Sequence, residues 1–300
     1  MANKVEYIWI DGKFTPFAKA RIHVLNHSLH YGSAVFEGIR CYATKNGPAV
    51  FRLKEHIDRL FHSAGTMGMA TAFTKKQAAQ AVLELIKKNK LQAGYIRPIF
   101  FYGEKMGLDP AGAPVQLAIA AWPWGKYLEK ESVSVKISSF ARIHPGSSVM
   151  TAKISGHYAN SIVASLEAKK AGFDEALLLD WRGNIAEGPG ENIFFVKGKK
   201  LYTPEAGTIL PGLTRGSVME IAGDFGYKTI EKKIRPKDLK SFDEAFFVGT
   251  AAEINAIGKI DKYIFGAGGE GIATREIREN YAKIIRGENK KYKKWLSYVK

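Results

Sequence analysis

Strand-like and helix-like stretches are segregated along this chain, and this segregation limits the folds that it can adopt. Alternating apolar and polar residues with turn signals between them, such as Asp11-Gly12, indicate strands and hairpins. Because strands and helices do not alternate strictly, the order favours an α+β fold over a parallel, doubly wound sheet. The first half is expected to contain strands at 5–10, 36–42, 49–53, 95–102 and 115–121 and helices at 55–64 and 75–88.

A break in the pattern divides the chain. The stretch Trp122-Pro123-Trp124-Gly125 interrupts the strands, and a charged stretch follows it. We therefore expect a small N-terminal domain at 1–121, a linker at 122–131 and a large C-terminal domain at 132–300. The second half is expected to contain strands at 132–138, 175–180 and 192–196 and helices at 157–170, 214–225 and from 272 onward.

The composition excludes several classes of protein. A chain of 300 residues with 46% hydrophobic and 25% charged residues can form a globular protein with a sizeable core. It contains no run of 18 apolar residues, and its first residues lack the apolar region of a signal peptide. The single cysteine, Cys41, cannot form an internal disulfide and fits a reducing compartment, so we expect a cytoplasmic location.

The formal net charge of +16 raises the alternative of a basic, non-catalytic protein that binds anions or nucleic acid. Much of the excess lies in helical-looking stretches such as Lys87-Lys88 and in the tail from Lys290 to Lys300. In the tail, Tyr292, Trp295 and Tyr298 indicate an amphipathic helix that packs its aromatic side. No nucleic-acid-binding motif accompanies these charges, so we interpret them as solvated surface that can attract small anionic substrates.

Two further motifs occur in unfavourable contexts. The stretch from Gly266 to Gly271 matches the dinucleotide pattern GxGxxG, but the 29 residues after it are too few for the βαβ units of a nucleotide crevice. A glycine-rich hairpin is the favoured interpretation. His23, His27 and His30 lie within eight residues, but no nearby acid or cysteine completes a typical ligand set. Packing or hydrogen bonding is therefore favoured for them, and no metal is expected.

The stretch from Thr151 to Ser161, TAKISGHYANS, contains the first candidate for chemistry. Lys153 precedes two small residues and Tyr158, and apolar residues then recur with helical spacing. A lysine held close to rigid structure suits an amine that must become a nucleophile, because partial desolvation or a cationic neighbour exposes the lone pair of such an amine. The helical stripe that we expect to be buried consists of Ala159, Ile162, Val163 and Leu166.

Four other stretches supply groups that complement such a lysine. Glu187 precedes a glycine-rich corner, and the turn at 210–216 opens a helix whose first N–H groups form a natural phosphate site. The turn at 249–253 offers a hydroxyl group, and Arg59 could pair bidentately with a phosphate. Together with Lys153 they provide what pyridoxal phosphate requires: an amine, an acid for the pyridine nitrogen, a phosphate site and a hydroxyl donor.

These stretches resemble those of the branched-chain amino-acid aminotransferases, which belong to the fold type IV pyridoxal-phosphate enzymes. The resemblance spans nearly the whole chain in the family's order. It rests on HYGSAVFEGIRCY (30–42), FRLKEHIDRL (51–60), YIRPIFFYG (95–103), AWPWG (121–125), TAKISGHYANS, IAEGPGEN, LPGLTRG and FFVGTAAEI. It implies a smaller N-terminal α/β sandwich domain, a larger C-terminal pseudo-barrel domain, and homodimers or assemblies of dimers whose active sites are completed by the partner.

The resemblance also implies the cofactor-binding residues. Lys153 would form the Schiff base with pyridoxal phosphate and move a proton, Glu187 would bind the pyridine nitrogen, and Tyr158 would bind the phenolic oxygen. The other implied cofactor contacts are Arg59, Leu213, Thr214 and Thr250 at the phosphate and Leu210 at the ring. His157 departs from the residue that the family often has before the tyrosine, so the resemblance assigns it no role.

Substrate choice is implied to depend mainly on the first half. Tyr95 and Arg97 lie two residues apart on an expected strand, so their side chains share a face, as do those of Phe36, Gly38 and Arg40. An arginine at the edge of an apolar pocket would receive the distal carboxylate of glutamate, while the pocket accepts branched side chains. The resemblance implies substrate contacts from Tyr95, Thr250, Ala251 and Ala252 at the α-carboxylate, from Arg97 and Tyr31 at the distal carboxylate, and from Phe36, Gly38, Trp124, Tyr127, Tyr158, Tyr31 and Leu108 around the side chain, with Tyr31 and Leu108 supplied by the partner subunit.

The implied function is reversible, ping-pong transfer of an amino group between L-leucine, L-isoleucine or L-valine and 2-oxoglutarate. Two relatives of the same fold, the D-amino-acid transaminases and the aminodeoxychorismate lyases, keep the lysine and the glutamate and are the alternatives. The YIRP strand and the GIRCY segment favour the branched-chain enzyme.

Overall fold

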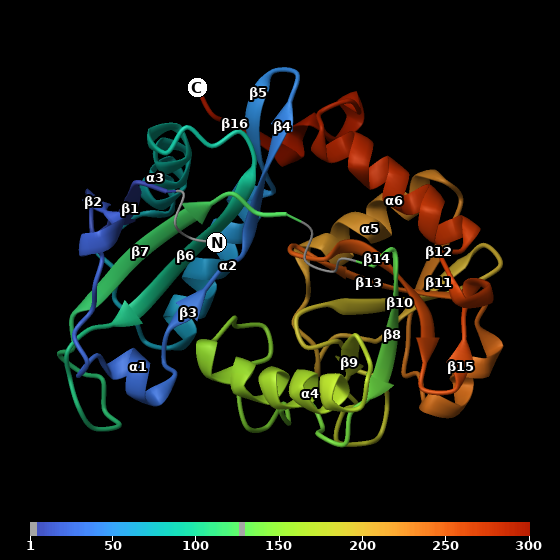
Figure 1. Cartoon of the computed structure of the whole chain (residues 1–300). Helices are drawn as coiled ribbons and strands as arrows, with labels where there is room; N and C mark the ends of the chain where they lie inside the picture. Colours follow the sequence, from blue (N-terminus) through green and yellow to red (C-terminus); the bar gives the residue numbers. More distant parts are fainter. Residues whose placement is uncertain (1–4, 126–129) are drawn as a thin grey trace. The chain divides into compact units, whose positions relative to one another are not determined.

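The computed structural model describes residues 5–125 and 130–300 (Figure 1). Contacts divide the chain into two compact units. Unit 1 comprises Met1–Gly125, Ala152–His157 and Lys283–Lys300, and unit 2 comprises Lys126–Thr151 and Tyr158–Ala282. Both units combine helices with a sheet, as the order of the elements predicts. None of the described helices is both long and apolar enough to cross a membrane.

Two segments from the second half of the chain belong to unit 1. Ile154 forms an isolated antiparallel bridge with Val35. Strand β16 (Leu296–Tyr298) pairs with strand β5 (Gly47–Phe51) in antiparallel register. The chain therefore returns to unit 1 twice. The boundaries expected from the sequence differ, because they assign all of 132–300 to one C-terminal domain. The pairing of β16 with β5 involves three residues of β16 and joins segments far apart in the sequence, so no local pattern predicts it.

Unit 1 is built on a sheet that has eight strands among the described residues. Its order is β16-β5-β4-β6-β7-β1-β2, with β3 paired to β6, and its pairings are antiparallel. The expected hairpin at Asp11-Gly12 is confirmed, because both residues have positive φ and join paired strands. The other elements are β1 (Tyr7–Ile10), β2 (Lys13–Pro16), η1 (Phe17–Lys19), α1 (His27–Tyr31), β3 (Val35–Phe36), β4 (Ile39–Thr44), α2 (Leu53–Thr66), α3 (Lys75–Lys88), β6 (Gly94–Tyr102), β7 (Val115–Trp122), η2 (Ser155–His157) and η5 (Lys290–Trp295).

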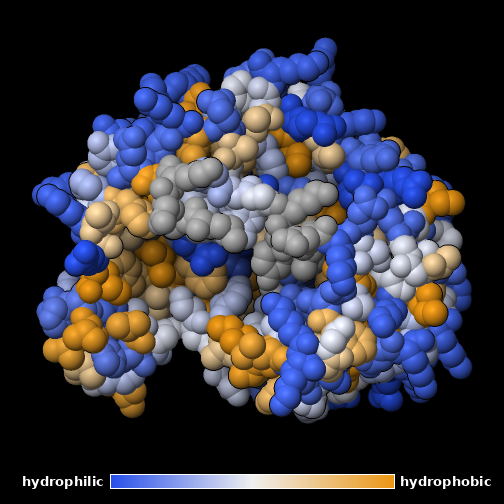
Figure 2. Space-filling view, in the orientation of Figure 1, coloured by the Kyte–Doolittle hydropathy of each residue, from blue (hydrophilic) through white to orange (hydrophobic). Residues whose placement is uncertain are grey.

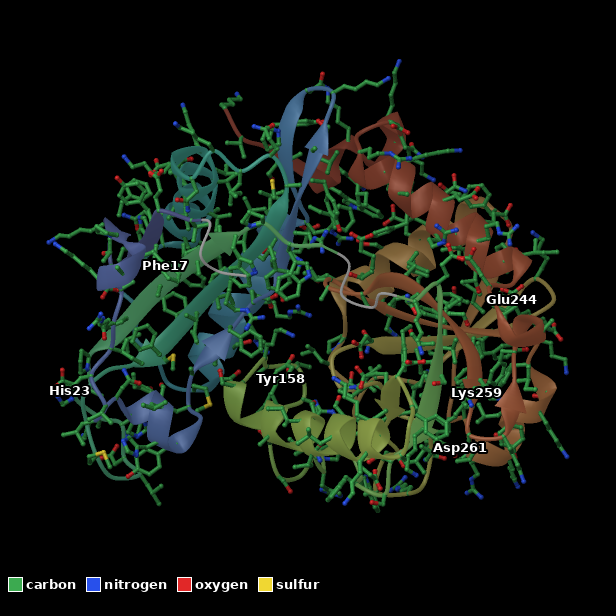
Figure 3. All side chains as sticks on the ribbon, viewed as in Figure 1. Phe17, His23, Tyr158, Glu244, Lys259 and Asp261 are labelled. Atoms are coloured by element: carbon green, nitrogen blue, oxygen red, sulfur yellow. The ribbon has the colours of Figure 1, made fainter. Side chains whose placement is uncertain are left out.

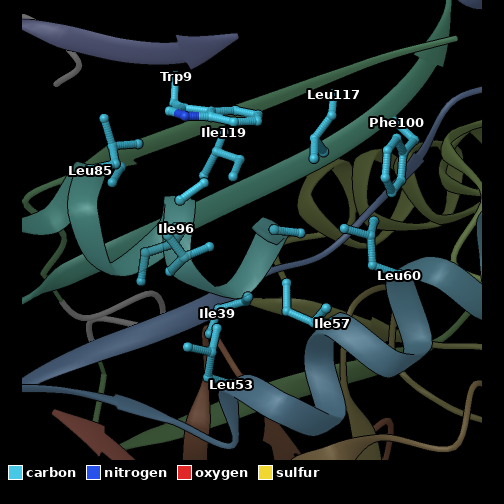
Figure 4. Close-up of a cluster of buried hydrophobic side chains, with 14 of the residues drawn as sticks. Trp9, Ile39, Leu53, Ile57, Leu60, Leu85, Ile96, Phe100, Leu117 and Ile119 are labelled. Carbon is cyan, nitrogen blue, oxygen red and sulfur yellow. The ribbon is translucent and has the colours of Figure 1, made fainter. Parts of the chain in front are cut away.

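Helices α2 and α3 pack together against this sheet and enclose the core of unit 1 (Figure 4). Thr74 caps α3 and forms a capping box with Gln77, which fixes where the helix begins. Its buried face contains the alanine, valine and leucine positions that the periodicity predicts. The core side chains labelled in Figure 4 are Trp9, Ile39, Leu53, Ile57, Leu60, Leu85, Ile96, Phe100, Leu117 and Ile119.

Unit 2 is built on a second sheet of eight described strands. Its order is β12-β11-β10-β13-β14-β8-β9, with β15 paired to β14, and it mixes parallel and antiparallel pairs. Its elements are β8 (Ser132–Ile137), α4 (Tyr158–Lys170), β9 (Glu175–Leu177), β10 (Asn192–Lys197), β11 (Lys200–Thr203), α5 (Leu213–Asp224), β12 (Lys228–Glu231), η3 (Pro236–Ser241), β13 (Glu244–Gly249), β14 (Glu253–Ile260), β15 (Tyr263–Ile264), η4 (Gly266–Gly268) and α6 (Ile272–Ile285), whose last residues belong to unit 1.

Helix α4 buries a different face from the one that its apolar spacing predicts. Its buried residues are Ser161, Ala164 and Ala168. Ile162 and Leu166 are 58% and 61% exposed, and Figure 2 shows hydrophobic surface over this helix. The prediction of a buried apolar stripe is therefore wrong. Small side chains let the helix lie close to β8 and β9, and the larger apolar side chains point away from this contact.

Two other expectations for the second half are wrong in form. The aromatic tail packs as expected, since Tyr292 and Trp295 are buried, but it forms a 3₁₀ turn and a strand instead of an amphipathic helix. The glycine-rich stretch forms the 3₁₀ turn η4 instead of a hairpin. This turn packs against β14. An added Cβ at Gly258 in β14 would lie 2.5 Å from the carbonyl oxygen of Gly268, so a side chain is excluded at Gly258.

Candidate active site

Lys153 lies in unit 1, where two backbone contacts fix it. Its N–H donates to Ser63 Oγ at 2.9 Å, and its carbonyl oxygen accepts from the N–H of Phe36 at 3.1 Å. The Nζ atom lies 5.1 Å from the centre of the Phe36 ring. Because Ser63 belongs to α2 and Phe36 to β3, the lysine backbone is anchored to a helix and to a strand. A fixed amine beside an apolar ring suits a nucleophile that must meet its target in one geometry.

Arg59 is held from one side by a carboxylate that the sequence patterns did not single out. Its Nε and Nη2 atoms donate to the two carboxylate oxygens of Glu37, at 2.6 and 3.0 Å. His56 Nδ1 lies 2.7 Å from the same carboxylate group. Arg59 therefore makes a bidentate contact with a carboxylate of its own chain, where the sequence suggested one with a phosphate, and this contact sets the plane of its guanidinium group.

The predicted shared face of Tyr95 and Arg97 is confirmed. Arg97 Nη2 donates to Tyr95 Oη at 3.1 Å, and the guanidinium carbon lies 4.5 Å from the centre of the Phe36 ring. The ring of Trp124 lies 5.3 Å from that of Tyr95. The buried atoms Arg97 Nε and Trp124 Nε1 have no hydrogen-bond partner among the described residues. Buried donors normally have an acceptor, so these two indicate a place for an anionic ligand beside an aromatic surface.

Gly38 makes room for the Tyr95 hydroxyl group. An added Cβ at this position would lie 1.9 Å from Tyr95 Oη and 2.8 Å from its Cζ. No side chain fits at that distance, so the glycine determines where the tyrosine hydroxyl can be. The neighbouring Arg40, also expected on this face, is buried and donates from Nη1 to the carbonyl oxygen of Gly125 at 3.3 Å.

Tyr31 and the loop that carries Leu108 are held together by hydrogen bonds. The N–H of Gly107 donates to Tyr31 Oη at 3.0 Å, and His27 Nε2 lies 3.0 Å from the Gly107 carbonyl oxygen. His27 is buried, and its Nδ1 lies 2.9 Å from Ser33 Oγ, so the hydrogen-bonding interpretation of this histidine is confirmed. Leu108 itself is 85% exposed. The loop therefore presents an apolar side chain outward from a fixed base.

Glu187 is the carboxylate around which the candidate site residues of unit 2 are arranged. It is buried, and its Oε1 accepts from Arg142 Nε at 2.6 Å. Its Oε2 accepts from Asn192 Nδ2 at 3.1 Å and from the N–H of Leu210 at 3.2 Å. Asn192 Oδ1 in turn accepts from the N–H of Gly212 at 3.1 Å. The amide of Asn192 therefore fixes the carboxylate and the entry to α5 in one arrangement.

The N-terminus of α5 has the features of an anion site. The helix begins at Leu213 after Gly212, which has no side chain to cap the first N–H groups. An added Cβ at Gly212 would lie 2.1 Å from Asn192 Oδ1, so the contact with Asn192 requires this glycine. Thr214 is buried in the first turn of the helix.

The other predicted residues of unit 2 lie at the ends of elements. Tyr158 is the first residue of α4 (Figure 3). Thr250, Ala251 and Ala252 form the turn between β13 and β14. Tyr127 lies outside the described residues.

Comparison with known proteins gives matches along the chain. The family "Amino-transferase class IV" matches residues 34–260. A branched-chain-amino-acid aminotransferase of Pseudomonas aeruginosa is 42% identical, over 100% of this chain and 99% of its own. The chain belongs to the class IV family of branched-chain aminotransferases.

Solved structures agree with this membership. The branched-chain aminotransferase of Thermoproteus uzoniensis, determined with norvaline, has a TM-score of 0.95 and 41% identity, with 99% of this chain and 100% of that chain covered. The T.th. branched-chain amino acid aminotransferase complexed with N-(5'-phosphopyridoxyl)-L-glutamate has a TM-score of 0.96 and 41% identity, with 99% of each chain covered. The two-domain α+β fold of this family is therefore the fold of this chain.

The residues that sequence reasoning missed are the partners of the charged groups. Glu37, Arg142 and Asn192 hold Arg59 and Glu187 in place, yet none of them was a candidate. One signal was available for Glu37. Phe36 and Gly38 were assigned to one face of a strand, which puts Glu37 on the opposite face, and a carboxylate on a buried face requires a partner. No comparable pattern pointed to Arg142.

Proposed function

We propose that this chain transfers an amino group between branched-chain L-amino acids and 2-oxoglutarate, with pyridoxal phosphate as its cofactor. The observation that carries the proposal is the placement of Arg97 over the Phe36 ring, beside the Tyr95 hydroxyl group. A cation at the edge of an aromatic surface can pair with the distal carboxylate of glutamate and leaves an apolar wall for a leucine side chain. The T.th. relative that was determined with a phosphopyridoxyl-glutamate compound supports both the cofactor and the acceptor.

The described residues fit this cofactor on three observations. Lys153 offers an amine on a fixed backbone, Glu187 offers a carboxylate held by Arg142, and α5 begins with N–H groups that have no side-chain cap. When bound, pyridoxal phosphate supplies the electron sink that stabilises the substrate carbanion. We assign the phosphate to Arg59, the first turn of α5 and Thr250, and the face of the ring to Leu210.

The chain's own residues would bind, orient and move protons. Lys153 Nζ would take the proton from the substrate α-carbon and deliver it to the C4′ carbon of the cofactor, which requires its neutral amine. Glu187 would retain a proton at the pyridine nitrogen, and Tyr158 would donate to the phenolic oxygen. Tyr95 and the backbone of Thr250, Ala251 and Ala252 would receive the α-carboxylate. The relatives reported above carry the branched-chain name, so the D-amino-acid transaminase and lyase alternatives are not favoured.

The test of the proposed function is a steady-state panel of amino donors with 2-oxoglutarate as the acceptor. L-Leucine, L-isoleucine and L-valine are expected to be substrates, and D-alanine is not. Activity with D-alanine alone would overturn the assignment in favour of a D-amino-acid transaminase. A protein that stays colourless after incubation with pyridoxal phosphate would instead favour the non-catalytic alternative.

Replacing Arg97 with alanine is expected to separate the two classes of substrate. Loss of the guanidinium group removes a charged hydrogen bond from glutamate but leaves the apolar contacts of leucine. The kcat/KM for glutamate should therefore fall at least about tenfold more than that for leucine. Arg182→Ala is a matched control, because Arg182 also lies over an aromatic ring, at 4.2 Å from the centre of Trp181. Equal losses for both substrates in Arg97→Ala would contradict the distal-carboxylate role.

Replacing Gly38 with alanine is expected to displace Tyr95. The added methyl group would lie 1.9 Å from the tyrosine hydroxyl, so that hydroxyl must shift, and we expect its contact with Arg97 to break. We expect kcat/KM for leucine and for glutamate to fall about a hundredfold, because small displacements of positioning groups have effects of this size. Gly65→Ala is the control, since an added Cβ there meets no atom within 4 Å. Unchanged kinetics in a folded Gly38→Ala variant would show that Tyr95 is not needed where the structure has it.

We further propose a homodimer in the cytoplasm. The support for the dimer is the apolar surface of unit 1, where Phe17, Ile22 and Leu29 are exposed and border a cavity of about 1080 Å³. Figure 2 shows hydrophobic surface in this region, over α1. A surface of this kind marks an interaction site more often than a solvated face. In such a dimer, Tyr31 and Leu108 would line the partner's pocket. The single cysteine supports the location.

A further inference from the structure

Glu37 is a carboxylate buried completely in unit 1, with 0% of its surface exposed. Its Oε1 accepts from Arg59 Nε at 2.6 Å, and its Oε2 accepts from Arg59 Nη2 at 3.0 Å and from His56 Nδ1 at 2.7 Å. A carboxylate at this depth is tolerated only when charged or polar partners surround it. Both carboxylate oxygens of Glu37 have such partners.

The local structure explains how the group is assembled. Glu37 directly follows β3, and its backbone N–H donates to the carbonyl oxygen of Pro98 at 2.9 Å, which fixes the side chain's origin. His56 and Arg59 lie three residues apart on α2, so both side chains are on one face of that helix. The group therefore joins the residue that follows β3 to helix α2 at one buried point.

The charges of the group are balanced. Burial alone would raise the pKa of Glu37, but the positive Arg59 and the hydrogen bond from His56 hold that pKa well below its usual range. Burial lowers the pKa of His56, Glu37 opposes this effect, and the charges of Arg59 and Lys153 lower it further. His56 is therefore a neutral donor to Glu37 through Nδ1–H, and Arg59 is the cation of the pair.

The same helix also connects Arg59 to Lys153. The Ser63 hydroxyl group donates to the carbonyl oxygen of Arg59 at 2.9 Å, and Ser63 Oγ accepts from the N–H of Lys153 at 2.9 Å. One turn of α2 thus fixes the backbone of both residues. What remains to be fixed is the direction of the long Arg59 side chain, which carries several rotatable bonds.

We propose that Glu37 is the positioning residue that orients the Arg59 guanidinium group toward the phosphate of the cofactor. The inference rests on the proposed function, since it takes Arg59 as a phosphate ligand. A bidentate contact through Nε and Nη2 fixes the guanidinium plane and directs its other N–H groups away from Glu37. A pre-oriented arginine loses less conformational entropy when the phosphate binds, so the carboxylate strengthens binding without touching the ligand.

The competing explanation is an ion pair that serves stability alone. The two explanations differ in one measurable quantity, the ratio of the affinity for pyridoxal phosphate to that for pyridoxal, which lacks the phosphate. A residue that acts through Arg59 on the phosphate changes this ratio. A residue that only stabilises the fold weakens the binding of both compounds equally, and the ratio stays constant.

The experiment measures both affinities by absorbance titration of the full chain freed of cofactor, for the wild type and for Glu37→Gln. The glutamine keeps the volume but replaces one acceptor oxygen with a donor that faces Arg59. We expect the ratio to fall about tenfold or more in Glu37→Gln, the size of a lost hydrogen bond to a charged group. Glu175→Gln is the matched control. Its carboxylate is also buried, and it accepts from Ser165 Oγ and from its neighbour's N–H, so the ratio should stay at the wild-type value.

Each outcome decides one question. If the wild-type chain binds neither compound, the proposed function fails. If the wild type binds pyridoxal phosphate and the ratio is unchanged in Glu37→Gln, the positioning role is overturned while the proposed function stands. If Glu37→Gln does not fold, Glu37→Asp takes its place, because it keeps the charge but is one methylene group too short for all three contacts. A ratio equal to that of the wild type in folded Glu37→Asp overturns the role equally.

Discussion

Replacing Lys153 with alanine is expected to lower the rate of transamination by about ten-thousandfold or more, because in the proposed function the same amine binds the cofactor covalently and moves the proton. The visible absorbance of the Schiff base should disappear, and borohydride treatment should no longer attach the cofactor to the chain. The measurements are turnover of L-leucine with 2-oxoglutarate, the absorption spectrum, and the mass of the reduced protein.

The control for this prediction is Lys259→Ala. The Nζ of Lys259 lies 5.1 Å from the centre of the Phe173 ring, the same distance that separates Lys153 Nζ from the Phe36 ring. Both variants therefore lose a lysine that lies beside an aromatic ring, and Lys259→Ala is expected to keep full activity. Residual Schiff-base absorbance in Lys153→Ala would show that another lysine binds the cofactor and would contradict the assignment.

Replacing Glu187 with glutamine is expected to lower kcat about a hundredfold to a thousandfold, the usual effect of removing one preorganised charge from a reacting centre. The amide would not retain a proton at the pyridine nitrogen. In the unsubstituted chain Arg142 donates to the Glu187 carboxylate at 2.6 Å, and in the variant the amide can present a donor to Arg142 instead. Because Lys153 is unchanged, the Schiff-base absorbance should persist. This split between binding and turnover is measured by cofactor titration and by steady-state kinetics.

The control for Glu187 is Glu231→Gln. Glu231 also forms a salt bridge with an arginine, since Arg215 Nη2 lies 2.7 Å from its Oε2, but its side chain is 41% exposed. Unchanged kinetics are expected for this variant. If Glu187→Gln retains normal kcat, or if it loses cofactor binding altogether, the electronic role of Glu187 is contradicted.

Local sequence patterns predict those elements of this fold whose ends and buried face are determined by residues within the element itself. Helix α3 begins and ends where the periodicity places it, because its apolar face and its capping box lie within the helix. The apolar spacing of α4 misleads, because the face that packs on the sheet consists of small residues such as Ala164 and Ala168. The strand β16 could not be predicted either. Its three residues are ordered by pairing with β5, a segment far away in the sequence.

The same distinction applies to the candidate site. Lys153, Glu187 and Arg59 are found because reactive groups occur in recognisable stretches. Glu37 and Arg142 are found only in the folded chain, because the contact of Glu37 with Arg59 joins the residue after β3 to a helix and that of Arg142 with Glu187 joins two loops. A side chain that satisfies a buried charge needs the right position in space but no fixed distance along the sequence. The sequence therefore indicates the candidate reactive groups, whereas the side chains that hold them are found only in the folded chain.

The most direct measurement of the central claim is the half-reaction of the enzyme loaded with pyridoxal phosphate. L-Leucine is added without an acceptor, and the corresponding 2-oxo acid is quantified. We predict one equivalent of 2-oxo acid per chain and no more until 2-oxoglutarate is added, after which glutamate appears and production resumes. Continued production without an acceptor, or no product from L-leucine while D-alanine reacts, would contradict the account.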